Sequence, residues 1–149
     1  MESNEIRIIY GKDAAAMTTK LIESIPLEDM IGDRSTQIVI KPNLVVPAKP
    51  ESGATTHMGI ISALIEYLQD HGFGNITIAE GSWVGSNTED AFRLNGYYKI
   101  RDKYGVKLVD TKKDRFRKLT YDGLTMEVSE TMLNAGFFIN LPVLKGHCQ

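Results

Sequence analysis

The sequence contains a single cysteine, Cys148, among its 149 residues. No intrachain disulfide can form, and this segment cannot supply the four thiolates that hold an ordinary iron–sulfur cluster. No apolar run approaches the roughly 20 residues that cross a bilayer. The first five residues carry neither the basic region nor the apolar region of a secretory signal. These absences predict a cytoplasmic protein that does not span a membrane.

A strong charge of one sign is also missing, because the formal net charge is -2. This balance gives no reason to expect nucleic acid or an anionic membrane as a partner. The G-x-G-x-x-G pattern, the Walker loop, the nucleophile elbow and paired cysteine motifs are absent as well. The common cofactor and hydrolase signatures therefore assign no function to this sequence.

Strand-like apolar runs alternate with helical apolar stripes along most of the chain. Helices are expected from Asp13 to about Ser24, from Thr55 or Thr56 through Asp70, and from Asn87 or Thr88 to roughly Lys103. Strands are expected at Glu5–Tyr10, Gln37–Lys41, Ile76–Ala79, Val106–Asp110 and Phe137–Leu141. The repeated strand–helix order favours a mostly parallel sheet with helices on both faces.

This order is interrupted by Asp122-Gly123, a two-residue turn signal between two strand-like segments. The segments pair consistently if Tyr121 faces Leu124, so a β-hairpin is expected from Phe116 to Val128. The basic residues of this region are typical of a solvated edge rather than of a nucleic-acid site. We therefore predict one α/β domain over residues 1–149, which we expect to be a fragment of a longer domain.

One group of polar residues follows the ends of two predicted strands and opens a helix: Lys41, Asn43, His57 and Glu80. Open α/β sheets place ligands at such strand ends. Lys41 and Asn43 suit a phosphate or a carboxylate, whereas His57 and Glu80 suit a metal or proton transfer. The structural alternatives are a solvated lysine, a histidine that caps its helix, and a Glu80 that pairs with Lys41.

A second group, Asn140, Lys145 and His147, follows the last buried strand. Two lysine, asparagine and histidine sets near one sheet edge suggest two halves of one site. Lys145 is a candidate for ligand binding. His57, Glu80 and His147 are candidates for catalysis or for an open metal site, because two histidines and a carboxylate suffice for one. The identity of any cofactor is left open.

Several motifs occur in order: Ile-Lys-Pro-Asn-Leu, Gly-Ala-Thr-Thr-His, Ala-Glu-Gly and Phe-Ile-Asn-Leu-Pro-Val-Leu-Lys-Gly-His. Together they resemble the domain-of-unknown-function family 362, from about Arg7 to the last residue. Members of that family are often labelled iron–sulfur cluster-binding because many carry a separate ferredoxin-like domain. This chain lacks cluster cysteines, so the resemblance implies no cluster within it. The family's recurrent polar positions correspond here to Lys41, Asn43, His57, Glu80, Lys145 and His147.

Two functions are compatible with these patterns. The first is a site for a small anionic ligand or a metal complex at the C-terminal edge of the sheet. The second is a non-catalytic docking domain of an iron–sulfur redox protein whose cluster domain lies outside this chain. A convergent polar cleft would favour the first function, and an exposed apolar patch at the sheet edge would favour the second.

Overall fold

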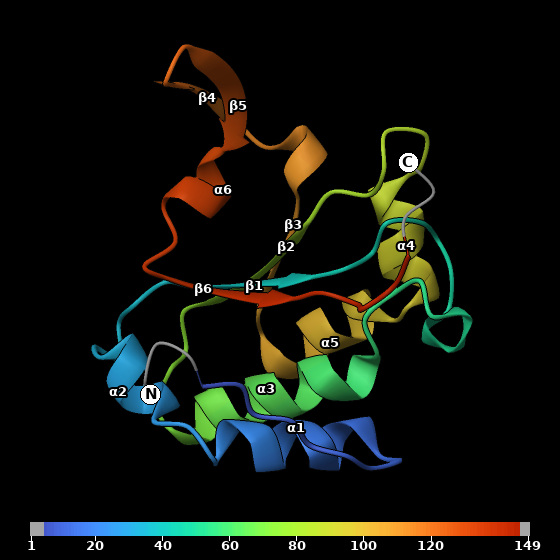
Figure 1. The fold of residues 1–149 in the computed structure, drawn as a ribbon, viewed down its shortest axis with the longest axis vertical. Helices are drawn as coiled ribbons and strands as arrows, with labels where there is room; N and C mark the ends of the chain where they lie inside the picture. Colours follow the sequence, from blue (N-terminus) through green and yellow to red (C-terminus); the bar gives the residue numbers. More distant parts are fainter. Residues whose placement is uncertain (1–4, 147–149) are drawn as a thin grey trace.

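The computed structural model describes residues 5–146 of the chain. Its centre is a four-stranded sheet in the order β3-β2-β1-β6, in which every neighbouring pair is parallel (Figure 1). The strands are β1 Ile38–Pro42, β2 Ile76–Glu80, β3 Lys107–Asp110 and β6 Phe137–Leu141. The predicted α/β class with a parallel sheet and a separate hairpin is confirmed.

The helices differ in length and in the side of the sheet that they cover. They are α1 Ala14–Ile22, α2 Leu27–Ile31, α3 Met58–Asp70, α4 Thr88–Leu94, α5 Tyr97–Tyr104 and α6 Glu130–Leu133. Figure 1 shows α1, α3 and α5 beneath the sheet, and α6 with the hairpin above it. None of the helices in the described part of the chain has the length and apolar character needed to cross a membrane.

The core lies between the sheet and α3. β1 and β2 contribute fully buried isoleucines such as Ile40 and Ile78, and α3 contributes Ile61, Ile65 and Leu68. Burying an aliphatic side chain of this size stabilises the fold by about 1.5–3 kcal/mol. This packing holds the ends of β1 and β2 in fixed positions, which matters for the polar residues that follow them.

The hairpin has the predicted register, with Tyr121 opposite Leu124. Its strands are β4 Phe116–Tyr121 and β5 Leu124–Ser129. Asp122 and Gly123 both have positive φ, 48° and 76°, as a type I′ turn requires. Alternate residues share one face, and this face carries four exposed apolar side chains: Leu119, Tyr121, Leu124 and Met126.

Asp114 joins the base of the hairpin to α6. Its carboxylate accepts hydrogen bonds from the Ser129 hydroxyl, from the Thr131 N–H at 2.9 Å and from the Arg115 N–H at 2.8 Å. Partial burial raises the pKa of Asp114, but these hydrogen bonds outweigh it and lower that pKa to about 2. The carboxylate therefore stays ionised and holds the hairpin base at neutral pH.

Two predicted elements are wrong. Glu5–Tyr10 forms no strand, and its Ile6 and Ile8 are 84% and 64% exposed. β-branched residues favour a strand only where a ladder and a packing surface exist, and this segment has no strand partner among the described residues. The single helix expected from Asn87 to Lys103 is instead two helices, because Gly96 has a φ of 74° and ends the helical path.

Candidate functional site at the C-terminal edge of the sheet

The polar residues gather where β1, β2 and β6 end. Because these strands are parallel, their carboxyl ends meet at one edge, and the register places Lys41 beside Asn140. The chain runs from β1 outward through β2 to β3, whereas β6 lies on the other side of β1. The direction of strand addition thus reverses between β1 and β6, and ligands of open α/β sheets bind at such a reversal.

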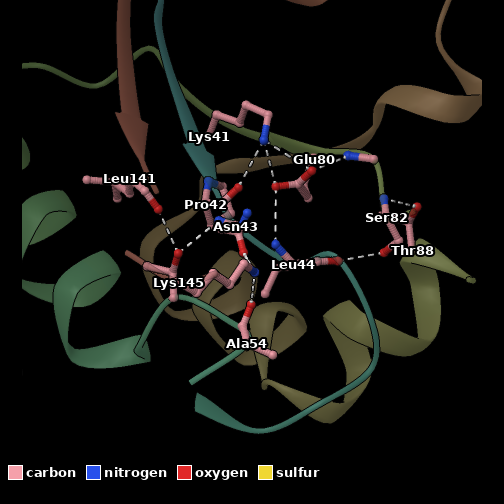
Figure 2. Close-up of polar contacts among 12 residues, drawn as sticks. Lys41, Pro42, Asn43, Leu44, Ala54, Glu80, Ser82, Thr88, Leu141 and Lys145 are labelled. Carbon is pink, nitrogen blue, oxygen red and sulfur yellow. Dashed lines mark hydrogen bonds and ion pairs between the residues drawn. The ribbon is translucent and has the colours of Figure 1, made fainter. Parts of the chain in front are cut away.

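Glu80 is the most buried charged group of this edge, with only 3% of the residue exposed. Its carboxylate accepts hydrogen bonds from Lys41 Nζ at 3.0 and 3.3 Å. It also accepts from the backbone N–H groups of Leu44 at 3.3 Å and Gly81 at 2.8 Å (Figure 2). The structural alternative for Glu80, a pair with Lys41, is therefore present. Glu80 fixes both the lysine and the path of the chain after β1.

Gly81 follows Glu80 at a point where no side chain fits. A Cβ atom built there would lie 2.4 Å from Thr111 Oγ1. The glycine lets the Thr111 side chain pack directly against the backbone that follows β2. The sequence placed Gly81 at a strand end, but the partner that excludes a side chain was not predictable from local pattern.

Thr56 connects three segments through one hydroxyl group. Its Oγ1 accepts the Asn43 N–H at 2.8 Å and donates to the Leu141 carbonyl at 2.8 Å. Its own N–H donates to the Asn43 carbonyl at 3.0 Å. Thr56 therefore ties the loop after β1 and the entry to α3 to the end of β6. Sequence reasoning missed this role, since Thr55 and Thr56 were expected only as caps of the helix.

Lys145 brings the second predicted group to the first. Its Nζ donates to Asn43 Oδ1 at 2.6 Å and to the Ala54 carbonyl at 2.7 Å (Figure 2). Lys145 and Asn43 are 102 residues apart in the sequence. Asn43 thus lies between two lysines, one from the end of β1 and one from the segment after β6. The juxtaposition is observed, and a ligand-binding role of these residues stays a prediction.

His57 has the capping role that was its structural alternative. It is the N-cap of α3, and its Nδ1 accepts the Gly59 N–H at 3.0 Å. The prediction that Thr55 or Thr56 caps this helix is wrong. Within residues 5–146 no three histidine, cysteine, aspartate or glutamate side chains gather as a metal ion would require. His147 and Cys148 lie outside the described residues, so the metal role of His57, Glu80 and His147 stays a prediction.

Buried polar groups continue beneath the strand ends. The Ser82 hydroxyl donates to the Leu44 carbonyl at 2.8 Å, and the Ser82 N–H donates to Thr88 Oγ1 at 3.1 Å. The Tyr97 hydroxyl is fully buried and has no hydrogen-bond partner among the described residues. Burial, and then the negative charge of Glu80, raise the pKa of Tyr97. Its hydroxyl therefore stays protonated and supplies no negative charge to this edge.

The fold and this edge define an α/β domain with a polar cluster between β1 and β6, where the direction of strand addition reverses. The chain belongs to the family described as Domain of unknown function (DUF362), whose model matches residues 38–149. It is similar to a thylakoid-associated protein of Synechocystis sp., with 25% identity over 118 residues. That match covers 79% of this chain but only 35% of the relative. No solved structure matches the chain.

Proposed function

We propose that the C-terminal edge of the sheet, between β1 and β6, binds a small anionic molecule or an anionic metal complex. The observation that carries this proposal is the pair of lysines, Lys41 and Lys145, on either side of Asn43. They lie where the direction of strand addition reverses, and open α/β folds bind ligands at such a point. The proposed ligand contacts are the two ammonium groups and the Asn43 amide.

The charge balance of this edge supports an anion. Lys41 and Lys145 carry two positive charges, and among residues 5–146 the carboxylate that pairs with Lys41 is Glu80. Both oxygens of Glu80 are engaged by Lys41 and backbone N–H groups, so that carboxylate is not oriented toward a ligand. α3 begins next to Asn43, and the N-terminus of a helix adds partial positive charge.

Inorganic phosphate and pyrophosphate are suitable probes for this site. We expect either anion to shift the amide resonances of Asn43 and Lys145 in NMR titrations of the full-length protein. Lys145→Met should weaken that binding about 10- to 150-fold, because a hydrogen bond to a charged group contributes about 1.5–3 kcal/mol. Lys118→Met is the matched control, since Lys118 lies on the hairpin, away from this edge, where it pairs with Glu127. Equal binding by both variants would contradict the proposal.

A docking role is the second candidate, favoured by the exposed apolar face of the β4–β5 hairpin. Tyr121 and Leu124 are 82% and 69% exposed near its turn. A two-stranded hairpin is marginally stable alone, and its apolar face gains stability when it is covered. We infer that this face contacts another part of the full-length protein, for which a redox module is the candidate.

Limited proteolysis of the full-length protein tests the docking role. A covered hairpin should resist cleavage by a protease of broad specificity, and a Tyr121→Lys/Leu124→Lys variant should lose that resistance. Cleavage of the wild-type hairpin at the rate of an exposed loop would contradict it.

A cytoplasmic location is also a proposal, and it rests on the lone cysteine. Thylakoid association is a property of the relative.

A further inference from the structure

The outer edge of β6 has no strand partner among residues 5–146. Its inner edge pairs with β1, and the Phe137 N–H donates to the Gln37 carbonyl at 3.0 Å. Backbone groups of successive residues in a parallel strand point to opposite sides. The N–H and C=O groups of Phe138 and Asn140 therefore point away from β1. Such a row of unpaired groups is a template for another strand.

The surroundings of this edge are apolar. Beneath it lies a groove of about 420 Å³, bounded by α1, α3 and β6. Its lining includes Met17, Leu21, Leu64, Ile139 and Leu141. Parallel sheets are rarely left open to water in this way, because both faces are normally covered.

The opposite face of the same edge carries Phe138. Phe137, Ile139 and Leu141 pack toward the main core, so Phe138 alternates to the other face, where it is 45% exposed. A bulky aromatic side chain on an unpaired edge strand adds a second apolar surface to the groove. Apolar surface therefore remains open on both faces of the β6 edge, in the groove on one face and at Phe138 on the other.

The topology predicts how a further strand would reach this edge. Crossovers between parallel strands are right-handed, so the direction of strand addition fixes the face that the connection crosses. From β1 to β2 the connection is α3, beneath the sheet, and from β3 back to β6 it carries α6 above the sheet (Figure 1). A further strand beyond β6 would be added in the same direction as β6 itself, away from β3. Its connection would cross the upper face, which carries Phe138.

We propose that a strand from the polypeptide following Gln149 in the full-length protein pairs parallel with the outer edge of β6. The chain spans 35% of the relative that it matches, so a large part of that protein has no counterpart here. A parallel strand that follows β6 needs a crossover of about a dozen residues or more, which is longer than the stretch from Pro142 to Gln149, so such a strand would lie beyond Gln149. Its inward side chains fill the groove at Ile139 and Leu141, and its crossover covers Phe138.

Residue-resolved hydrogen exchange in the full-length protein tests this pairing. The Phe138 and Asn140 amides should exchange at least about 100-fold more slowly than unprotected amides. The Phe137 and Ile139 amides face β1 and provide the internal control. Unprotected exchange at Phe138 and Asn140, with protection at Phe137 and Ile139, would overturn the proposal.

Two further measurements identify the occupant. Protection that disappears on dilution would indicate a second copy at this edge. Protection that disappears on removal of residues 1–10 would indicate the N-terminal segment, since Ile9 already lines the groove. Either result would overturn the assignment to a segment beyond Gln149. Protection that survives both changes supports it.

A matched pair of substitutions reports on the cover over Phe138 without measuring exchange. Phe138 and Leu94 have nearly equal exposure in this structure, 45% and 46%. If a crossover covers Phe138, Phe138→Glu should lower the Tm of the full-length protein by several degrees more than Leu94→Glu. Equal shifts in Tm would contradict a covered Phe138.

Discussion

Replacing Glu80 by glutamine should destabilise the fold although the two side chains have nearly the same size. The two carboxylate oxygens accept different backbone amides, Oε1 from Gly81 and Oε2 from Leu44. Glutamine offers one oxygen and one NH₂ group. Whichever way the amide turns, one backbone N–H faces a donor and loses its hydrogen bond.

The expected cost follows from burial. Glu80 is 3% exposed, and a buried backbone group without a partner costs about 1–3 kcal/mol. Loss of the ion pair adds up to about 1 kcal/mol, because the Lys41 side chain is one-third exposed and solvent screens the pair. We expect Glu80→Gln to lower the free energy of unfolding by about 1–4 kcal/mol. That is a large share of the stability of a typical domain.

Chemical denaturation followed by circular dichroism measures this change, and Lys41→Ala is the control. Lys41→Ala removes the same ion pair but leaves both backbone amides bonded to Glu80. The Lys41 side chain is one-third exposed, so water can take the place of its ammonium group beside the carboxylate, and the substitution should cost only about 1 kcal/mol. The reasoning is refuted if Glu80→Gln costs no more than Lys41→Ala. In that case the backbone contacts of Glu80 would contribute nothing measurable.

Two other predictions concern the Thr56 hydroxyl and the Asp114 carboxylate. Thr56→Val should lower the free energy of unfolding by about 1–3 kcal/mol, because the Asn43 N–H and the Leu141 carbonyl lose their shared partner. Thr56→Ser keeps the hydroxyl, so the same denaturation assay should show a smaller decrease in the free energy of unfolding. The pKa of Asp114 is about 2 when folded against 3.8 when unfolded, so its stabilising contribution is complete above about pH 4 and falls as the pH drops toward 2. The protection factors of the hairpin amides, which are exchange rates corrected for the intrinsic pH dependence of amide exchange, should therefore fall over that range in the wild type. An Asp114→Asn variant whose protection factors fall equally would contradict this assignment.

The sequence predicted the elements whose signals are local. Asp122-Gly123 defines a turn and the hairpin register by itself. The helix expected from Asp13 is α1, and the Asp13 side chain caps it. The failures come from signals that depend on distant partners. Glu5–Tyr10 has the residues of a strand but no ladder among the described residues, and Gly96 interrupts a helix whose apolar periodicity continues past it.

The candidate site also contains residues that local pattern predicted and residues that it did not. The strand-end positions of Lys41, Asn43 and Glu80 followed from periodicity and from Pro42. Thr56 gave no such signal, because its partner Leu141 is 85 residues away and a threonine before a helix normally caps it. Contacts of this kind follow from strand order, and a single sequence leaves strand order open.

The separation of Lys145 from Asn43 has a consequence for synthesis of the chain. The two halves of the candidate site cannot meet until residue 145 has left the ribosome and β6 has joined β1. Closing so long a loop delays this contact relative to the helices and the hairpin. A ligand that bridges Lys41 and Lys145 would bind only after that step, so its binding would report that the sheet has closed and would hold it closed by mass action.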